Sequence, residues 1–193
     1  MCLFIKEFIT NPFSTGAIAS SSPELAELIT STAKLANHKT IVEIGSGMGV
    51  FTKRILESKI NTSNFFVIEL NPKFALETKK RCPKIDVYTD SASNINKYLQ
   101  NMELEGCDCI ISSLPWTAFK NNIQEELLDS IHNSLLPGGI FLTYVYIHSQ
   151  FLPAGIRFRK KLIHKFGNIN KTHTVWKNIP PAFVYYSIKN ELI

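Results

Sequence analysis

The sequence predicts an α/β protein whose seven-stranded sheet is mostly parallel, with one antiparallel strand near the C-terminus and helices on both faces. Two observations carry this prediction. Strand-like and helix-like segments alternate along the chain from residue 40 onwards, which is typical of a parallel sheet covered by helices. The last two strand-like segments are joined only by residues 177–181, and such a short connection makes a hairpin instead of a parallel crossover.

Each element has a local reason. The segment Thr40–Ile44 (TIVEI) is rich in β-branched apolar residues, as expected of a buried strand. Pro72 begins a helix where its missing N–H costs no hydrogen bond, and Pro137-Gly138-Gly139 ends another. The expected strands are 40–44, 65–70, 85–89, 107–112, 140–148, 171–176 and 182–188. The expected helices are 50–58, one from residue 72, 94–100 and 121–135. No repeat or linker interrupts the series, so we expect one domain over residues 1–193.

Composition limits the class of protein. Of the 193 residues, 45% are apolar and 19% are charged, which supports a sizeable core and excludes a disordered, collagen-like or disulfide-stapled chain. The net charge of +5 can be assigned to residues 151–166, a segment rich in Lys and Arg that has no acidic residue. Such a segment favours anionic partners, either a membrane surface or nucleic acid.

The cysteines Cys2, Cys82, Cys107 and Cys109 do not have a metal-binding spacing. We therefore expect reduced thiols, no metal site and a cytoplasmic protein. The N-terminal segment does not have the pattern of a signal peptide. The longest uncharged apolar run, residues 139–147, is too short to cross a bilayer, so we expect a soluble or peripheral protein.

A glycine loop, Glu43-Ile44-Gly45-Ser46-Gly47-Met48-Gly49, is the most informative segment. Closely spaced glycines between a strand and a helix let the backbone approach a ligand. A phosphate-binding P-loop would require G-x-x-x-x-G-K-[ST], which this loop lacks. A dinucleotide fingerprint would require a glycine where Val50 stands. The observed G-x-G-x-G spacing fits neither of these two patterns, and a glycine-rich turn without a ligand remains the alternative.

Two later acidic residues extend this pattern. Glu69 ends the second strand, where a carboxylate can accept both hydroxyl groups of a ribose. Asp90 follows the third strand. Because ligands in such sheets bind at the carboxyl ends of the strands, we expect Glu69 and Asp90 to lie beside the glycine loop.

These elements resemble the motifs of class I S-adenosylmethionine-dependent methyltransferases, which have a Rossmann-like fold. The resemblance implies S-adenosylmethionine as the cofactor, with Glu69 at the ribose and Asp90 near the adenine amine. The cofactor-binding residues implied or expected are Gly16, Ala17, Ile18, Glu43, Gly45, Ser46, Gly47, Gly49, Val50, Phe51, Glu69, Leu70, Asp90, Ser91, Ala92, Ser112 and Leu114.

A more specific resemblance covers nearly the whole chain. The segments that carry it are Gly16-Ala17-Ile18-Ala19-Ser20-Ser21-Ser22, Ser113-Leu114-Pro115, Thr143-Tyr144-Val145-Tyr146 and Trp176-Lys177-Asn178-Ile179-Pro180-Pro181-Ala182. They are similar to segments of the bacterial phospholipid N-methyltransferases. Ser20, where Pro is usual, and Ser113, where Gly is usual, depart from that pattern, and Tyr146 and His148 stand where a Gly-Pro turn is expected. The resemblance implies methylation of phosphatidylethanolamine toward phosphatidylcholine at a membrane surface.

Other functions remain open. The segment Ser112-Ser113-Leu114-Pro115-Trp116 is partly similar to the acceptor motif of adenine-N6 methyltransferases of RNA, but Ser113 replaces the Asn or Asp that binds the target amine. Ribosomal RNA adenine dimethylases also have a helical C-terminal domain for which this chain is too short. A small-amine methyltransferase and a non-catalytic, membrane-associated cofactor binder are the further alternatives.

Two segments are expected at the membrane, and one set of residues at the acceptor. Residues 1–22 begin with an amphipathic helix, and residues 151–170 form a basic amphipathic segment with Phe158, Leu162, Ile163 and Phe166 between its charges. The expected substrate- or membrane-binding residues are Trp116, Arg157, Arg159, Lys160, Lys161 and Lys165. The candidates for accepting the proton of the substrate amine are Tyr144, Tyr146 and His148, which alternate at the end of a strand.

Overall fold

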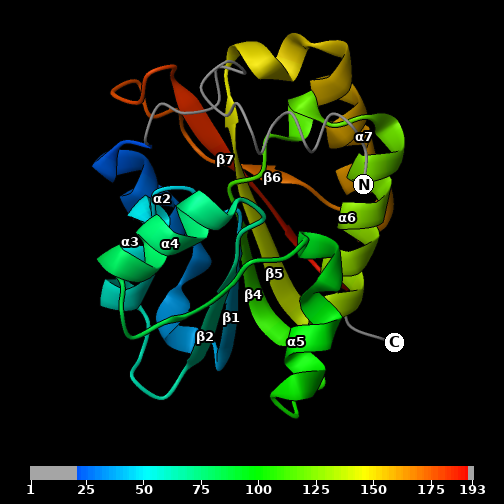
Figure 1. Ribbon diagram of the computed structural model, residues 1–193. Coiled ribbons are helices and arrows are strands. Elements are labelled where there is room, and N and C mark those ends of the chain that lie inside the picture. The colour runs from blue at the N-terminus through cyan, green and yellow to red at the C-terminus, as the bar shows by residue number, and fades with distance from the viewer. Residues whose placement is uncertain (1–20, 191–193) are drawn as a thin grey trace.

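The computed structural model describes residues 21–190 of the chain and contains a seven-stranded sheet (Figure 1). The strands are β1 (Thr40–Ile44), β2 (Asn64–Ile68), β3 (Asp86–Tyr88), β4 (Cys107–Ser112), β5 (Leu135–Tyr146), β6 (Asn170–Lys171) and β7 (Ala182–Ile188). The α-helices are α2 (Pro23–Ala33), α3 (Val50–Ser58), α4 (Pro72–Arg81), α5 (Ile95–Asn101), α6 (Asn121–Ser134) and α7 (Pro153–Phe166). Short 3₁₀ helices are η2 (Leu35–Asn37), η3 (Ala92–Asn94), η4 (Trp116–Ala118) and η5 (His148–Phe151).

The strand order in the sheet is β3-β2-β1-β4-β5-β7-β6. β1 pairs in parallel with β2 and β4, β2 with β3, and β4 with β5. β7 runs antiparallel to β5, and β6 runs antiparallel to β7. The predicted fold class, a mostly parallel sheet with an antiparallel strand near the C-terminus, is confirmed.

Several predicted boundaries are wrong: β2 ends at Ile68 instead of residue 70, β5 ends at Tyr146 instead of residue 148, and two differences are larger. β6 is far shorter than 171–176; beyond it, Thr172 still hydrogen-bonds Val184 of β7, and Val175 forms an isolated bridge with Ala182. β5 begins directly after α6, so Pro137-Gly138-Gly139 belongs to the strand instead of ending the helix. The physical reason is backbone pairing: Gly138 N–H donates to Lys189 O at 2.9 Å, and Lys189 N–H donates to Gly139 O at 2.8 Å.

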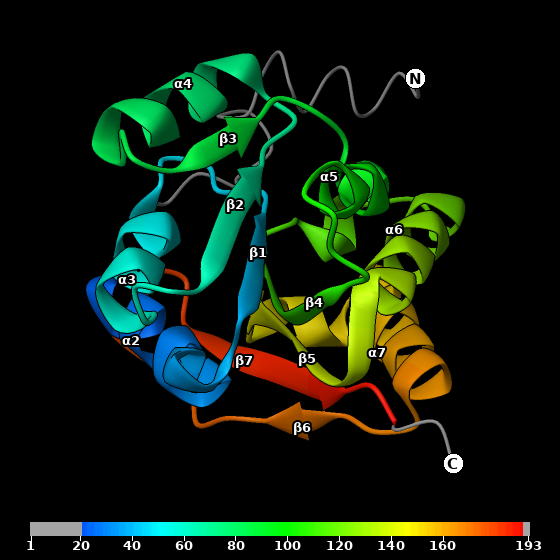
Figure 2. The ribbon, with the colours of Figure 1, turned by 90° about the horizontal axis from the view of Figure 1, so that it is seen from below.

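The helices form a layer on each face of the sheet (Figure 2). α2, α3 and α4 lie on one side, and α5, α6 and α7 lie on the other. Successive side chains of a strand point to opposite faces, so Ile41 of β1 packs toward the first layer while Val42 and Ile44 pack toward the second. All residues of β1 are buried, as a strand covered on both faces requires.

Capping fixes where two of the helices begin. Ser22 Oγ accepts the N–H of Leu25 at the start of α2, and Asn71 Oδ1 accepts the N–H of Lys73 at the start of α4. A proline occupies an early position of both helices, where its missing N–H is not needed. Asn71 lies two residues after Glu69 and shortly past the end of β2, so this cap also fixes the chain at the carboxyl end of the sheet. Within residues 21–190, no helix has the length and apolar character needed to cross a membrane.

Candidate active site

The glycine loop after β1 has a backbone conformation that glycine adopts readily. Gly45, Gly47 and Gly49 have φ angles of 75°, 55° and 75°, where a side chain costs roughly 1–2 kcal/mol. A Cβ on Gly45 would lie 2.9 Å from Leu114 Cδ2, whereas one on Gly47 would meet no atom within 4 Å. Gly47 lines a pocket, so its backbone is open to a ligand.

Glu69 joins the end of β2 to the glycine loop. Its Oε2 accepts the N–H of Gly47 and its Oε1 accepts the N–H of Asn71, both at 2.9 Å. The residue is only 7% exposed, and it lines the pocket. Burial raises the pKa of Glu69, while the two backbone donors oppose that shift by stabilising the carboxylate. A carboxylate offers about four acceptor sites, so Glu69 can accept further hydrogen bonds from a ligand.

Asp90 is held by donors from its own segment. Oδ1 accepts the N–H of Ser91 at 2.7 Å and the Nδ2 of Asn94 at 2.8 Å, and Oδ2 accepts the hydroxyl of Tyr98 at 2.7 Å. Burial acts to raise the pKa of Asp90, but these hydrogen bonds outweigh it and hold the pKa below its usual value. An ionised carboxylate is thereby fixed in the pocket wall.

The pocket lies at the carboxyl ends of the parallel strands and brings together most of the predicted cofactor residues. Those that line it are Gly45, Ser46, Gly47, Val50, Phe51, Glu69, Leu70, Asp90, Ser91, Ala92 and Leu114. Gly49 caps α3 and Ser112 Oγ accepts the N–H of Leu114 at 3.3 Å, so both support the loops behind the pocket without lining it. The predicted residues Gly16, Ala17 and Ile18, and the amphipathic helix expected at the N-terminus, lie outside the described residues.

Further residues line the pocket that the sequence did not assign to it: Ser21, Met48, Ile68, Asn71, Phe74, Ser113, Pro115, Phe119, Ile123, Glu126 and Leu127. Asn71 and Phe74 follow Glu69 closely in the sequence, so their place in the pocket lining could have been predicted from Glu69. Ile123, Glu126 and Leu127 have the spacing of one helix face. That spacing alone does not tell which face of α6 meets the pocket.

Glu43 does not line the pocket, contrary to the prediction. It lies on the sheet face that α2 and α3 cover and is 0% exposed. Within the described residues neither carboxyl oxygen has a hydrogen-bond partner; Thr52 is near, but its hydroxyl is also unpartnered. Burial raises the pKa of Glu43 to about 8, and Glu69 adds to the shift. Glu43 is therefore a mostly neutral group behind the loop.

Tyr144 and Tyr146 alternate at the end of β5 as predicted, whereas His148 lies beyond the strand, in η5; the three rings still form a row. The ring centroids are 5.5 Å apart for Tyr144 and Tyr146, and 5.8 Å apart for Tyr146 and His148. Of the three, Tyr144 lines the pocket, where Phe51 meets it edge to face at 5.7 Å. Burial raises the pKa of Tyr144, and Tyr146 adds to the shift, so the hydroxyl of Tyr144 stays neutral. Tyr144 is suited to orienting a ligand and poorly suited to accepting a proton.

S-adenosylmethionine fits these residues. Gly47 leaves space in front of its backbone, and the buried carboxylate of Glu69 lies beside it. The described lining residues include the acids Glu69, Asp90 and Glu126 and no Lys, Arg or His. That charge suits a cofactor with a positive sulfonium and no phosphate. Within residues 21–190, no group of three or more His, Cys, Asp or Glu side chains is placed to hold a metal ion.

Comparison with known proteins identifies the type of enzyme. A sequence model of the family described as "Ribosomal RNA adenine dimethylase" matches residues 19–135, more than half of the chain. The chain belongs to this family. The predicted S-adenosylmethionine-dependent methyltransferase is thereby confirmed. The match covers the part of the chain that binds the cofactor. It does not identify the molecule that accepts the methyl group, because Ser113 departs from the adenine-binding motif.

Relatives of this methyltransferase include a lipid-modifying enzyme. The chain is 25% identical over 192 residues to the ornithine lipid N-methyltransferase of Singulisphaera acidiphila, a match that covers 95% of this chain and 93% of the relative. Among solved structures, an O-methyltransferase of Bacillus cereus has a TM-score of 0.70 at 14% identity, covering 98% of this chain and 92% of that one. The O-methyltransferase TomG of Streptomyces achromogenes has a TM-score of 0.71 at 15% identity, covering 97% and 89%. These two share the fold.

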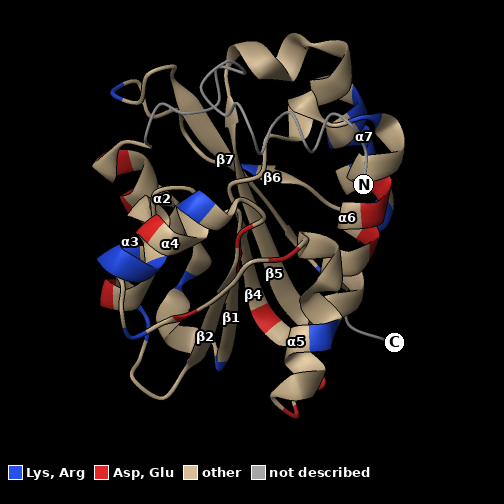
Figure 3. Ribbon diagram, viewed as in Figure 1, with Lys and Arg blue, Asp and Glu red and all other residues tan. Residues whose placement is uncertain are grey.

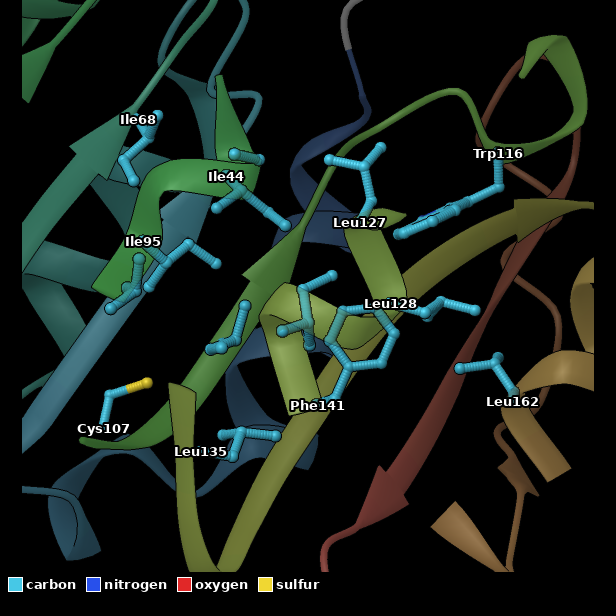
Figure 4. Packing of buried hydrophobic residues seen from close by; sticks show 14 of the residues in the cluster. Ile44, Ile68, Ile95, Cys107, Trp116, Leu127, Leu128, Leu135, Phe141 and Leu162 are labelled. Atoms are coloured by element: carbon cyan, nitrogen blue, oxygen red, sulfur yellow. The ribbon is translucent and has the colours of Figure 1, made fainter. Parts of the chain in front are cut away.

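Trp116 of this methyltransferase is a core residue, which corrects its predicted contact with substrate or membrane. It is only 3% exposed, and Figure 4 shows it among the side chains of the apolar cluster. Its indole N–H donates to Thr143 Oγ1 at 3.1 Å, and its ring stacks on Phe158 with centroids 4.4 Å apart. A buried tryptophan usually has a hydrogen-bond partner for its N–H, and Thr143 is that partner here.

The apolar side of α7 also belongs to the core. Phe158, Leu162 and Phe166 are each 1% exposed and pack between α7 and the sheet. Burying each such side chain stabilises the fold by about 1.5–3 kcal/mol. The predicted entry of Phe158, Leu162 and Phe166 into a membrane is therefore wrong, because the sheet already covers them. Ile163, the fourth predicted apolar residue of this segment, is 37% exposed.

Two of the predicted basic residues are paired with α6. Lys161 donates to Glu125 Oε2 at 2.8 Å, and Lys165 forms an ion pair with Asp129. Figure 3 shows the acidic residues of α6 beside the basic residues of α7. The predicted contribution of Lys161 and Lys165 to an anionic surface is corrected accordingly. Arg157, Arg159 and Lys160 are exposed, and Arg159 lies near the hydroxyl of Tyr185.

Proposed function

We propose that the protein methylates the amine of a membrane-lipid head group with S-adenosylmethionine, as a peripheral protein on the cytoplasmic face of a membrane. The observation that carries the proposal is the chemistry of the pocket. Its described lining combines acidic and aromatic residues, and Ser113 replaces the amide or carboxylate that an adenine acceptor requires. An amine acceptor is compatible with such a site, since it is cationic before it loses its proton.

The proposed lipid class is one with an amine in its head group. The resemblance of the sequence to phospholipid N-methyltransferases supports phosphatidylethanolamine. The relative from Singulisphaera acidiphila supports an ornithine lipid instead. Both share the chemistry that the pocket would recognise, and the experiment below separates them.

The chain's own residues would contribute alignment and charge. Bound S-adenosylmethionine supplies a methyl group on a sulfonium, and the transfer needs an amine aligned in line with it. Glu69 would hold the ribose hydroxyl groups, and it fixes Gly47 through its hydrogen bond. The neutral hydroxyl of Tyr144 would orient the amine, and the aromatic faces of Phe51 and Tyr144 would attract it as it becomes a methylated cation.

The proton of the amine needs another acceptor. Because Tyr144 is held neutral, the proton would pass to water, either directly or through the hydroxyl of Tyr146 beside that of Tyr144, with the exposed His148 next along the row. In this role Tyr146 and His148 act outside the pocket, and Tyr144 acts as a positioning residue within it.

Methylation of adenine in RNA is the second candidate function. The observation that favours it is the family match over residues 19–135. It would require Ser113 to replace an Asn or Asp at the target amine with a single hydroxyl group, which offers fewer hydrogen bonds.

The experiment is methyl transfer from labelled S-adenosylmethionine to separated acceptors. Purified protein is incubated with detergent-dispersed phosphatidylethanolamine, with ornithine lipid and with total RNA. The Glu69→Ala variant serves as the control for cofactor-dependent labelling. Label in either lipid identifies the lipid class. Label in RNA alone refutes the lipid proposal and supports the second candidate.

A further inference from the structure

The loop between β6 and β7 exposes two large apolar side chains. Trp176 is 73% exposed and Ile179 is 79% exposed, and Lys177 between them is exposed as well. Leaving such side chains in water is unfavourable unless a partner covers them. We call residues Trp176–Ile179 the apolar loop.

Hydrogen bonds fix the apolar loop in place, so the exposure of its side chains does not come from a flexible backbone. Asn178, at its centre, is 2% exposed. Its Oδ1 accepts the N–H of Ser22 at 2.9 Å, and its Nδ2 donates to Pro180 O at 2.6 Å. Val175 and Ala182 close the base of the loop through two backbone hydrogen bonds. Trp176 and Ile179 are therefore presented outward by a preformed scaffold.

A second apolar group lies at the same end of the sheet. Phe151 of η5 is 72% exposed, and Leu152 after it is 45% exposed. β5 leads into η5, and Ala182 of β7 pairs with Tyr146 of β5, so both groups emerge where these two strands meet (Figure 1). This is the end of β5 at which Tyr144 enters the pocket.

We propose that the apolar loop, together with Phe151 and Leu152, is the surface by which the protein contacts a lipid bilayer. Exposed Trp and Ile have the chemistry of an interfacial anchor, because such side chains enter the acyl boundary. Lys177 between them is paired with Glu24 of α2 at 3.5 Å and stays exposed, so it lies at head-group level without adding a free positive charge. The exposed Arg157 and Lys160 of α7 follow Leu152 in the chain and suit the anionic lipids of such a surface. This inference rests on the proposed lipid substrate, since it brings the pocket to the membrane.

The connection to the pocket is short. Ser22, which Asn178 holds, directly follows Ser21, and Ser21 lines the pocket. The Ser21 side chain also lies near the hydroxyl of Tyr144. A bilayer that receives Trp176 and Ile179 would therefore lie against the segment that borders the pocket.

The test measures sedimentation with vesicles of phosphatidylcholine alone and with one-fifth phosphatidylglycerol. The double variant Trp176→Ser/Ile179→Ser should bind both kinds of vesicle at least tenfold more weakly than the wild type. Ile188→Ser is the matched control, because Ile188 is an apolar residue, 43% exposed, at the opposite end of β7. It should bind like the wild type. Unchanged cofactor affinity, measured by calorimetry, shows that the double variant keeps its pocket.

Each outcome decides one question. Equal vesicle binding by the double variant and the wild type, or no binding by the wild type, overturns the inference. So does a loop-dependent dimer in sedimentation velocity, because a second copy would then cover the loop. Methyl transfer from the wild type to dispersed lipid is measured separately. If that transfer fails while the loop still governs vesicle binding, the proposed function fails and the membrane surface stands.

Discussion

Replacing Glu43 by Gln should make the stability of the protein less sensitive to pH, so that the variant gains on the wild type as the pH rises. Glu43 is fully buried, and neither of its carboxyl oxygens has a partner within the described residues. Its pKa is raised from 4.5 to about 8, chiefly by burial and further by Glu69. The folded protein therefore binds this proton more tightly than the unfolded chain does. Stability contributed by the protonated group is present below about pH 4.5 and is lost as the pH rises toward 8.

The size of the effect follows from the shift. Between the two pKa values, each pH unit costs the wild type about 1.4 kcal/mol relative to a side chain that does not titrate. The accumulated cost is about 1 kcal/mol at pH 5 and about 3 kcal/mol at pH 7. The amide of the variant is also buried, but its cost does not depend on pH. The difference in unfolding free energy between variant and wild type should thus rise by about 2 kcal/mol from pH 5 to pH 7.

Urea unfolding at pH 5, 6, 7 and 8, without added cofactor, measures this difference. Glu105→Gln is the control, because Glu105 is exposed and its carboxylate remains in water. A difference for Glu43→Gln that stays constant over this range would show that the carboxyl group is not held neutral by burial.

Three further predictions concern the pocket and its supports. Gly47→Ala should lose about 1–2 kcal/mol of stability to its positive φ but remain folded, because the added Cβ meets no atom within 4 Å. It should weaken cofactor binding at least tenfold in calorimetry, and full affinity would contradict the open approach at this backbone. Tyr144→Phe should lower kcat about tenfold, the value of roughly one hydrogen bond, without moving the pH–rate profile. A lost ionisation in that profile would make Tyr144 the proton acceptor after all. Asn178→Ala removes two hydrogen bonds from a buried amide and should lower the free energy of unfolding by about 1–3 kcal/mol in urea titration, and an unchanged midpoint would exclude a structural role.

The sequence alone determined the fold class and the cofactor end of the pocket, because both depend on local patterns. Alternating strands and helices imply a parallel sheet, and the carboxyl ends of its strands necessarily meet. The glycine loop, Glu69 and Asp90 were therefore identifiable from their places after consecutive strands. The start of β5 could not be predicted in this way, since the pairing of Gly138 and Gly139 with Lys189, directly after β7, is a contact between distant segments.

Only the tertiary structure decided which amphipathic features are buried. The periodicity of α7 shows an apolar face and a basic face, but it does not tell what the apolar face covers. In the structure Phe158 and Leu162 pack on the sheet, and Asp129 neutralises Lys165. Glu43 likewise lies next to the glycine loop in the sequence. Its side chain nevertheless points to the sheet face that α2 and α3 cover and does not reach the pocket, because neighbouring strand residues alternate in direction. Burial arises from contacts between segments far apart in the chain, and local patterns leave those contacts undetermined.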